Sequence, residues 1–306
     1  MGKRLSRVDF FLMLSFILLL FLIVAAFFLG VKIGKEQTEK KYEPLFAAEN
    51  AEQEEVSAYD QRHLVSFYHN VFLPYREFHK KWFEHMNALS LASGTANPAA
   101  LVEELANLAE KQHIAIRVSA VPGTAPLLQE AHSDLLKSLK LFSEGLSEGK
   151  PADESWEEWQ QFIENNEYIT EAKKLALSGQ RKYFASIVKW NESVDPLLKH
   201  TDLLEKQNLS PEQWNQLNLN EKNQYIATIM ENKQLFEPFY PQDVTIRVDE
   251  IIRNGTIEPL KLGNIDEIVD TLMLTGAVRY GDFIQDKNRY YAGEQLPQLP
   301  FFAALQ

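Results

Sequence analysis

The sequence predicts a mainly all-α protein with one N-terminal transmembrane helix, a helical-bundle body and a small helical C-terminal region. Three observations support this fold class. An uninterrupted apolar run covers residues 10–31, apolar residues recur at steps of three and four through most of the remaining chain, and Gly, Pro, Asn and Ser clusters separate these stretches. A three-and-four spacing is typical of helices with one buried face.

The apolar run Phe10–Val31 contains no charged residue. A helix needs about 20 apolar residues to cross the hydrocarbon core of a bilayer, and it satisfies its backbone hydrogen bonds internally. We therefore predict that residues 10–31 span the membrane and contact its lipid, after a short basic tail at residues 1–9. A cleaved signal peptide is the alternative, which the length disfavours because apolar signal regions usually have about 7–15 residues.

The basic residues on the two sides of this run nearly balance. Lys3, Arg4 and Arg7 precede it, and four lysines interleaved with three glutamates follow it. Orientation depends on Lys and Arg near the membrane, and acidic residues count little. The short basic tail favours a cytoplasmic N-terminus with the body outside the cytoplasm, and the opposite orientation remains open.

The rest of the chain is predicted to contain a stalk and two helical parts. A charged stalk covers residues 32–58, a helical-bundle domain covers 59–196, and a smaller helical domain with a Pro-rich tail covers 197–306. Proline lacks the backbone N–H of a helix interior, so Pro74 is expected to kink or divide the first long helix of the bundle. Residues 114–121 alternate weakly and are interpreted as an extended segment.

The C-terminal part carries several signals for the ends of helices. Ser210-Pro211 is typical of a helix start, and Asn254-Gly255 and Gly276 are typical of helix ends. Residues 277–283 are interpreted as a strand. The tail at residues 295–306 is Pro-rich and then apolar, and we expect it to dock on the body, with a short recognition peptide as the alternative.

Composition excludes several classes of protein. The chain has no cysteine, which rules out disulfides, thiolate nucleophiles and cysteine-bound metal clusters. Its net charge is −12, whereas a nucleic-acid-binding protein neutralises phosphates with Lys and Arg. We therefore expect no nucleic-acid partner. A hydrophobic fraction of 45% is that of a folded protein.

The motif search predicts no catalytic, cofactor-binding or metal-binding residue. Ser147 lies in a G-x-S-x-G pattern, but a helix precedes it where a nucleophile elbow needs a strand. Asp60 with His63, and Glu110 with His113, resemble the acid-x-x-His pairs of di-iron bundles. A full site also needs inward Glu residues on two further helices, and the first pair begins with Asp, so we treat both pairs as polar helix ends.

The predicted function is that of a non-enzymatic interaction or scaffold protein of the cell envelope, whose acidic helical body binds another envelope protein. The alternative is a membrane-anchored sensor or carrier that holds a small ligand in an aromatic-lined cleft of the bundle. A hydrolase or metalloenzyme ranks last. The candidate residues for the ligand or partner surface are aromatic side chains of the bundle: Tyr68, Tyr75, Trp82, Trp156 and Trp159.

Overall fold

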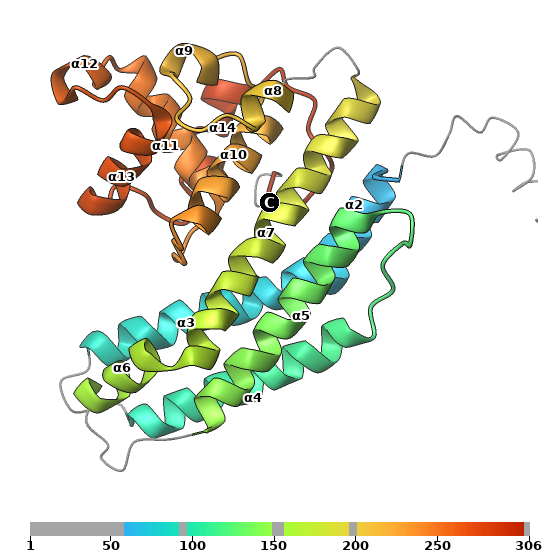
Figure 1. Ribbon diagram of the computed structural model, residues 1–306, viewed down its shortest axis with the longest axis vertical. Helices are drawn as coiled ribbons and strands as arrows, with labels where there is room; N and C mark the ends of the chain where they lie inside the picture. The colour runs from blue at the N-terminus through green and yellow to red at the C-terminus, as the bar shows by residue number, and fades with distance from the viewer. Residues whose placement is uncertain (1–57, 92–96, 149–155, 196–200, 303–306) are drawn as a thin grey trace, which may run out of the picture. The chain divides into compact units, whose positions relative to one another are not determined.

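Helices make up the part of the chain that the computed structural model describes, namely residues 58–91, 97–148, 156–195 and 201–302 (Figure 1). This confirms the all-α fold class for these residues. The predicted transmembrane helix at residues 10–31 lies outside them. Among the described helices, none has the length and apolar character needed to cross a membrane.

The first helices form an antiparallel bundle in which α5 packs against both α4 and α7, and α4 also packs against α3 (Figure 1). The bundle consists of α2 (Gln61–Phe67), a π-helical turn η1 (Tyr68–Phe72), α3 (Leu73–Leu91), α4 (Pro98–Arg117), α5 (Pro126–Ser147), α6 (Trp156–Asn165) and α7 (Glu167–Val194). Asn97 caps α4 as its side chain accepts the Ala100 backbone N–H at 3.1 Å, with Pro98 at the first helical position.

The remaining helices pack beside the C-terminal half of α7, which contacts α10 (Figure 1). They are α8 (Thr201–Leu204), α9 (Pro211–Trp214), α10 (Leu219–Asn232), α11 (Pro241–Arg253), α12 (Ile257–Leu260), α13 (Ile265–Thr275) and α14 (Asp282–Tyr291). Ser210 forms the predicted cap at the start of α9, and Gly276 ends α13 with a φ of 60°.

The predicted interruption at Pro74 takes the form of the π-helical turn that separates α2 from α3. The Leu73 N–H bonds to the Tyr68 carbonyl, five residues back. Because Pro74 has no N–H, the Asn70 carbonyl loses its ordinary helical donor. The Ser119 hydroxyl, which follows α4, donates to that carbonyl oxygen at 2.9 Å. The break in one helix is thus satisfied by its neighbour.

Two predicted extended segments are wrong. Residues 114–117 continue α4, because the fully buried Ile116 lies on the helix face that packs into the core, and its carbonyl accepts a hydrogen bond from His132 Nε2 at 2.8 Å. In the predicted strand at residues 277–283, residues 277–281 form a loop and residues 282–283 begin α14. Gly281 has a φ of 89°, and Asp282 accepts the Arg279 backbone N–H at 2.7 Å, so this segment turns where a strand would extend.

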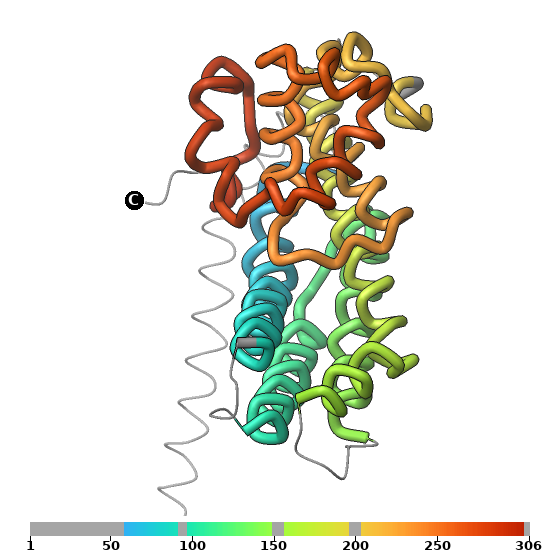
Figure 2. Tube along the Cα trace, turned by 90° about the vertical axis from the view of Figure 1, so that its left-hand side faces the viewer, coloured from blue at the N-terminus to red at the C-terminus, as the bar shows by residue number. Residues whose placement is uncertain are grey.

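The largest apolar cluster joins the bundle to the end of the chain. It contains Leu64 and Tyr68 from the first helices, and also Leu299, Phe301 and Phe302 from the tail. The Phe301 ring lies 5.6 Å from the ring of Tyr68. The tail therefore docks on the body, as predicted, and Figure 2 shows the C-terminal segment beside the first helices.

A second apolar cluster is built mainly from helices after residue 200 and includes Trp214, Ile226, Val244 and Ile268. The described residues after Val56 nonetheless belong to one compact unit, Ser57–Gln306. The helices of the C-terminal part thus pack both on the bundle and on one another.

Glycine allows α5 and α7 to approach closely. A Cβ atom at Gly179 would lie 2.8 Å from Leu135 Cγ and 3.2 Å from the Ala131 carbonyl oxygen. We expect Gly179→Ala to lower the free energy of unfolding by about 1–2 kcal/mol, because overpacking outweighs the better helix propensity of alanine. Urea denaturation followed by circular dichroism measures this. Gly123→Ala is the control, since its nearest neighbour is 3.8 Å away; an equal loss in both variants would contradict the prediction.

Candidate functional site

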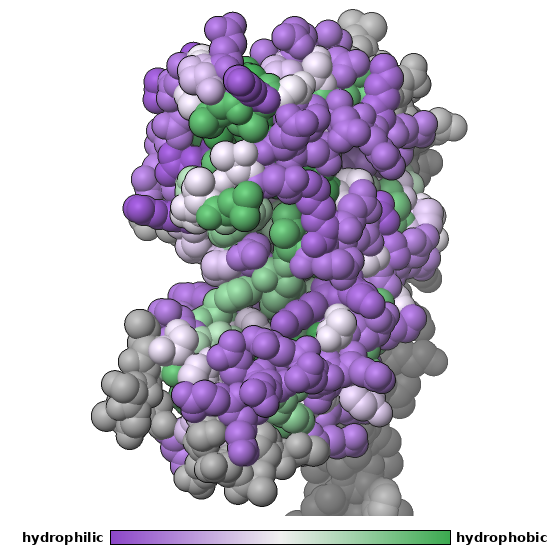
Figure 3. Space-filling view, turned by 60° about the vertical axis from the view of Figure 1, so that its left-hand side comes forward, coloured by the Kyte–Doolittle hydropathy of each residue, from purple (hydrophilic) through white to green (hydrophobic). Residues whose placement is uncertain are grey.

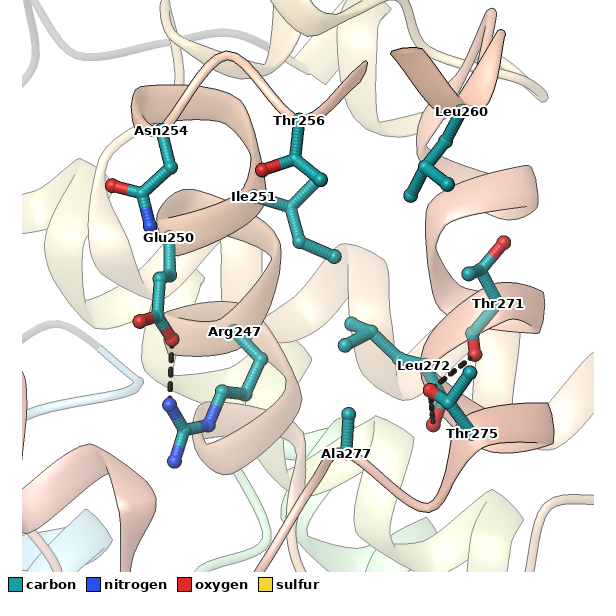
Figure 4. A pocket seen from close by; sticks show the side chains of 10 residues that line it. All are labelled: Arg247, Glu250, Ile251, Asn254, Thr256, Leu260, Thr271, Leu272, Thr275 and Ala277. Atoms are coloured by element: carbon teal, nitrogen blue, oxygen red, sulfur yellow. Dashed lines mark hydrogen bonds and ion pairs between the residues drawn. The ribbon is translucent and has the colours of Figure 1, made fainter.

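A groove of about 290 Å³ lies between α11, α12 and α13 in the C-terminal part (Figure 4). We call it the α11–α13 groove. Three helices and their connecting turns contribute to its walls. The lining residues are Arg247, Glu250, Ile251, Asn254, Thr256, Leu260, Thr271, Leu272, Thr275 and Ala277.

Three left-handed backbone positions shape this groove. Gly255 follows the end of α11 with a φ of 66°, Lys261 ends α12 with a φ of 55°, and Gly276 ends α13 with a φ of 60°. Each reverses the chain within a few residues. No residue of α12 itself is buried, so this short helix forms an exposed wall of the groove.

One end of the groove is polar and fixed. Arg247 of α11 donates from Nε and Nη2 to the two carboxylate oxygens of Asp282, at 2.8 and 2.6 Å. It also donates from Nη1 to Glu250 at 2.6 Å, the ion pair drawn in Figure 4. The hydrogen bonds to Asp282 are the largest cause of the raised pKa of Arg247. The guanidinium is thus engaged by two carboxylates and holds α11 against α14.

The rest of the groove is mainly apolar. Ile251 and Leu272 contribute side chains, and Thr271 and Thr275 donate their hydroxyls to carbonyls one turn back, at 2.9 and 2.7 Å (Figure 4). A threonine bonded in this way has its hydroxyl proton already engaged, so it offers a ligand its methyl group and an acceptor oxygen. The groove thus suits an apolar group better than an anion.

One exposed leucine lines the groove, and a second is adjacent in sequence to a lining residue. Leu260 on its wall is 49% exposed, and Leu274, next to the lining residue Thr275, is 88% exposed. On the face drawn in Figure 3, hydrophobic residues form patches among polar ones in the upper half, where Figure 1 places the C-terminal helices.

The surface around the groove is acidic. Glu258, Glu267 and Asp270 are exposed on α12 and α13. Lys233 pairs with Asp270 at 2.5 Å, and Arg253 and Lys261 are exposed bases on the two sides of α12. The segment from α11 to α13 therefore carries an excess of carboxylates at its surface, which favours a basic partner.

The predicted aromatic site residues lie elsewhere. Tyr68, Tyr75, Trp82 and Trp159 are each no more than 4% exposed and belong to the large core cluster, where Trp156 packs as a partly buried neighbour. None of the five lines the α11–α13 groove or a second cavity near α10. In this structure these rings fill the bundle core.

The acid-x-x-His pairs are used by local contacts. Asp60 caps α2 by accepting the His63 backbone N–H at 2.8 Å. Glu110 lies 3.5 Å from Lys140 Nζ, and His113 Nδ1 lies 3.1 Å from the Leu136 carbonyl. Within the described ranges, no group of three or more His, Cys, Asp or Glu side chains is placed to hold a metal ion.

The G-x-S-x-G pattern falls at a helix end, as the sequence indicates. Ser147 donates its hydroxyl to the Ser143 carbonyl at 2.7 Å in the last turn of α5. Gly145 permits a close approach, since a Cβ there would lie 2.9 Å from Tyr168 Cβ. Asn166 donates to the Gly145 carbonyl at 2.9 Å, so the pattern serves the packing of α5 on the start of α7.

No motif in the sequence marks the α11–α13 groove. One usable signal is Leu274, which lies off the apolar stripe of Ile265, Ile268 and Leu272 that buries α13. An apolar residue outside the buried stripe is unremarkable when single, because much of any protein surface is apolar. Only the groove beside it distinguishes this leucine.

The site has to be interpreted from its own geometry. Comparison of the whole chain with models of protein families, with curated proteins and with solved structures gives no match.

Proposed function

We propose that this chain is a single-pass, membrane-anchored interaction protein of the cell envelope, without enzymatic activity. Residues 10–31 anchor it in the membrane with the N-terminus in the cytoplasm, and the helical body outside the cytoplasm binds another protein. The anchor confines the body to the membrane surface, which raises its effective concentration toward a partner held there.

The observation that carries this proposal is the α11–α13 groove with its exposed leucines. Leu260 on the wall of the groove of about 290 Å³ is 49% exposed, and Leu274, which precedes the lining residue Thr275 in the sequence, is 88% exposed. Apolar surface next to a groove is favourable to cover, and it marks protein-binding sites more often than scattered single residues do. The groove can accept one or two apolar side chains of a partner segment.

The surrounding charge defines the rest of the partner. Glu258 and Glu267 are exposed beside the groove, so Lys or Arg residues that flank the apolar anchor would be attracted to this surface. The partner is therefore proposed to present a segment with an apolar anchor and basic flanks. The division into a bundle at 59–196 and a C-terminal domain at 197–306 stays a prediction, in which the bundle supports the domain that binds.

Site-specific crosslinking in intact cells tests the binding surface. A photoreactive residue at position 274 of the full-length, tagged protein is expected to capture one reproducible partner. The same residue at position 118 is the matched control, because Val118 is also exposed, at 78%, but ends α4 of the bundle. Capture of the same protein with equal yield at both positions would contradict the groove as the binding site.

Two substitutions test the chemistry of the interface. Leu274→Asp removes the apolar anchor, and Glu258→Lys reverses a charge; each is expected to lower co-purification of the crosslinked partner by tenfold or more. The matched controls are Val118→Asp and Glu103→Lys, both at exposed positions of the bundle. Exposed substitutions typically change stability within about 0.5 kcal/mol, so a thermal melt should show intact folding. Unchanged co-purification in both groove variants would overturn the proposal.

The anchor has its own test. Removal of residues 1–31 is expected to move the protein from the membrane fraction to the soluble fraction. A truncated protein that still sediments with membranes would show that other residues attach it.

A further inference from the structure

Arg76 of α3 lies among aromatic residues that come from distant parts of the chain. Its guanidinium carbon lies over the ring of Tyr240, 4.4 Å from the centroid, and 6.0 Å from the ring centroid of Phe301. Nη1 donates to the Tyr68 hydroxyl at 3.1 Å, and Nη2 donates to the Tyr280 hydroxyl at 3.4 Å. We call this arrangement the Arg76 site. It joins the first helices of the bundle to the segments that precede α11 and α14.

The π-helical turn η1 places Tyr68 and Arg76 on one face of the helix. In a regular α-helix, residues eight positions apart point about 80° away from each other. A π-helical turn takes up one residue more than an α-helical turn. Across η1, residues eight apart are therefore related as residues seven apart are in an ordinary helix, two turns along the same face. The interruption before Pro74 thus brings a hydrogen-bond acceptor to Arg76.

Among the residues that the structure describes, Arg76 has no carboxylate counter-ion. Burial acts to lower the pKa of Arg76, and the groups that raise it against this effect are tyrosines, with no carboxylate among them. Glu237, on the same segment as Tyr240, is not the partner, because burial alone raises the pKa of its carboxyl. A charge that is partly removed from water is ordinarily paired.

Other partly buried cations of this protein follow that rule. Each of two has a carboxylate oxygen within 3 Å: Lys182 lies 2.7 Å from Asp134, and Arg247 lies 2.6 Å from Asp282. Arg76 instead has a ring face and two neutral hydroxyls, which stabilise a cation without neutralising it. The site therefore retains one positive charge that a ligand can balance.

The Arg76 site is open to solvent on the side of Tyr280. The Tyr280 residue is 59% exposed, and Arg76 is itself partly exposed. Each Nη nitrogen carries two protons and gives one of them to a tyrosine, and the Tyr280 hydroxyl keeps its own proton when it accepts from Nη2. Donors thus remain for a ligand, and the planar guanidinium matches the two oxygens of a carboxylate.

We propose that the Arg76 site binds a small monocarboxylate with an apolar body. One negative charge balances the single guanidinium, whereas a dianion would bring a second, unbalanced charge next to aromatic rings. The exposed ring of Tyr280 offers apolar contact to the rest of the ligand. None of these residues lines the α11–α13 groove, so this binding is independent of the proposed protein interaction.

Four probes that share one ring and differ in the attached group test the ligand chemistry. They are benzoate, benzyl alcohol, benzylammonium and phenyl phosphate, the last a dianion at pH 7.5. Saturation-transfer NMR measures their binding to the full-length protein in detergent micelles, with protein-free micelles as the background. We expect benzoate to bind at millimolar concentration, with a dissociation constant at least tenfold below those of the other three. No binding of benzoate, or equal or tighter binding of another probe, would overturn the proposal.

Arginine variants locate the binding. Arg76→Gln removes the charge and is expected to weaken benzoate binding tenfold or more, the value of a hydrogen bond to a charged group. Arg76→Lys keeps the charge without the planar fork, so a smaller loss is expected. Arg62→Gln is the matched control, because Arg62 is exposed on α2, and its affinity should be unchanged. Benzoate affinity that is equal in Arg76→Gln and in the unaltered protein would show that the carboxylate binds elsewhere.

A tyrosine variant keeps the test decisive if Arg76→Gln fails to fold. Tyr280→Phe leaves the exposed ring in place and removes only the hydroxyl, and it is expected to weaken benzoate binding about three- to tenfold. Tyr168→Phe is the matched control, since Tyr168 is 45% exposed on α7. Circular dichroism of each variant checks the fold. Unchanged benzoate affinity in a folded Tyr280→Phe protein would contradict the assignment of the site.

Discussion

Asp249→Asn is expected to lower the free energy of unfolding by about 3–5 kcal/mol, the cost of breaking a buried ion pair from one side. Asp249 is 4% exposed and accepts hydrogen bonds from Lys222 Nζ at 2.9 Å, from Trp214 Nε1 at 2.8 Å and from the Tyr291 hydroxyl. An asparagine has the same shape but no charge. It would remove the hydrogen-bonded counter-ion of the buried Lys222 ammonium and turn an amide donor toward other donors.

This network explains why the effect is large. Trp214, Lys222, Asp249 and Tyr291 belong to α9, α10, α11 and α14, so four helices meet at one carboxylate. The rings of Trp214 and Tyr291 lie 5.3 and 5.2 Å from Lys222 Nζ, so both contribute cation–π attraction in a desolvated site. The loss of the carboxylate therefore weakens the packing of all four helices on one another.

Urea denaturation at pH 7, followed by circular dichroism, measures this prediction. Glu84→Gln is the control, since it breaks an exposed Lys81–Glu84 pair of 2.9 Å and should cost less than about 1 kcal/mol. The double variant Lys222→Met with Asp249→Leu removes both charges and should recover part of the loss, since the Trp214 and Tyr291 donors still lose their acceptor. A loss below about 1 kcal/mol in Asp249→Asn would show that the carboxylate is not a central contact.

The second large effect is a loss of stability in mild acid that originates at His79. Burial, followed by the nearby Arg76 guanidinium, lowers the pKa of His79 from 6.5 to about 3. The ring also contacts the Tyr240 hydroxyl at 3.2 Å from Nδ1, and the Glu237 carbonyl accepts a hydrogen bond from it. No carboxylate is among the groups that shift this pKa, and the Glu237 carbonyl, which favours the protonated ring, is outweighed by burial and by Arg76.

The direction of the pH effect follows from the pKa of His79 in the unfolded chain, 6.5, and in the folded protein, about 3. Above pH 6.5 the ring is neutral in both states, and its contribution to stability is complete. As the pH falls below 6.5, His79 becomes protonated in the unfolded chain but stays neutral in the folded protein. The free energy of unfolding therefore declines until the pH reaches the folded pKa of about 3. At pH 5 the expected loss is about 2 kcal/mol relative to pH 8.

Comparing the pH dependence of stability in a His79 variant with that of the unaltered protein isolates the contribution of His79. The free energy of unfolding of His79→Gln should change less between pH 8 and pH 5 than that of the unaltered protein, by about 2 kcal/mol. Burial raises the pKa of Asp243 to about 6, and this group favours folding as the pH falls. It is present in both proteins and cancels in the difference. His69→Gln, at an exposed position, should leave the pH dependence unchanged. Equal pH dependence in all three proteins would contradict a neutral buried His79.

Much of the fold follows from local signals in the sequence. The cap at Asn97, the helix start at Ser210 and the stop at Gly276 are each specified by residues within one turn, and the structure has all three. The extended interpretation of residues 114–121 failed because it rested on a weak alternation of β-branched residues. The burial of Ile116 against neighbouring helices outweighs that local preference.

The candidate sites could not be predicted from local sequence signals, because their residues come together only through tertiary packing. The second cavity, near α10, combines Asn191, Asn218 and Glu294, which lie on three separated segments and match no motif. Asn218 is readable from the sequence as a helix cap, but its unpaired amide nitrogen is a property of the folded surroundings. The aromatic stripe of the first helix is conspicuous in the sequence and turns out to fill the core.

The docked tail has a consequence for how the protein is made. The Gln298 backbone N–H donates to Gln61 Oε1 at 3.4 Å, a contact between residues 237 positions apart, and Phe301 packs on Tyr68. During synthesis the first helix leaves the ribosome long before the rings that cover it. Its aromatic residues stay accessible to chaperones or to other nascent chains until residue 302 has emerged. A chain truncated late in synthesis would therefore be an incompletely closed bundle with exposed aromatic residues.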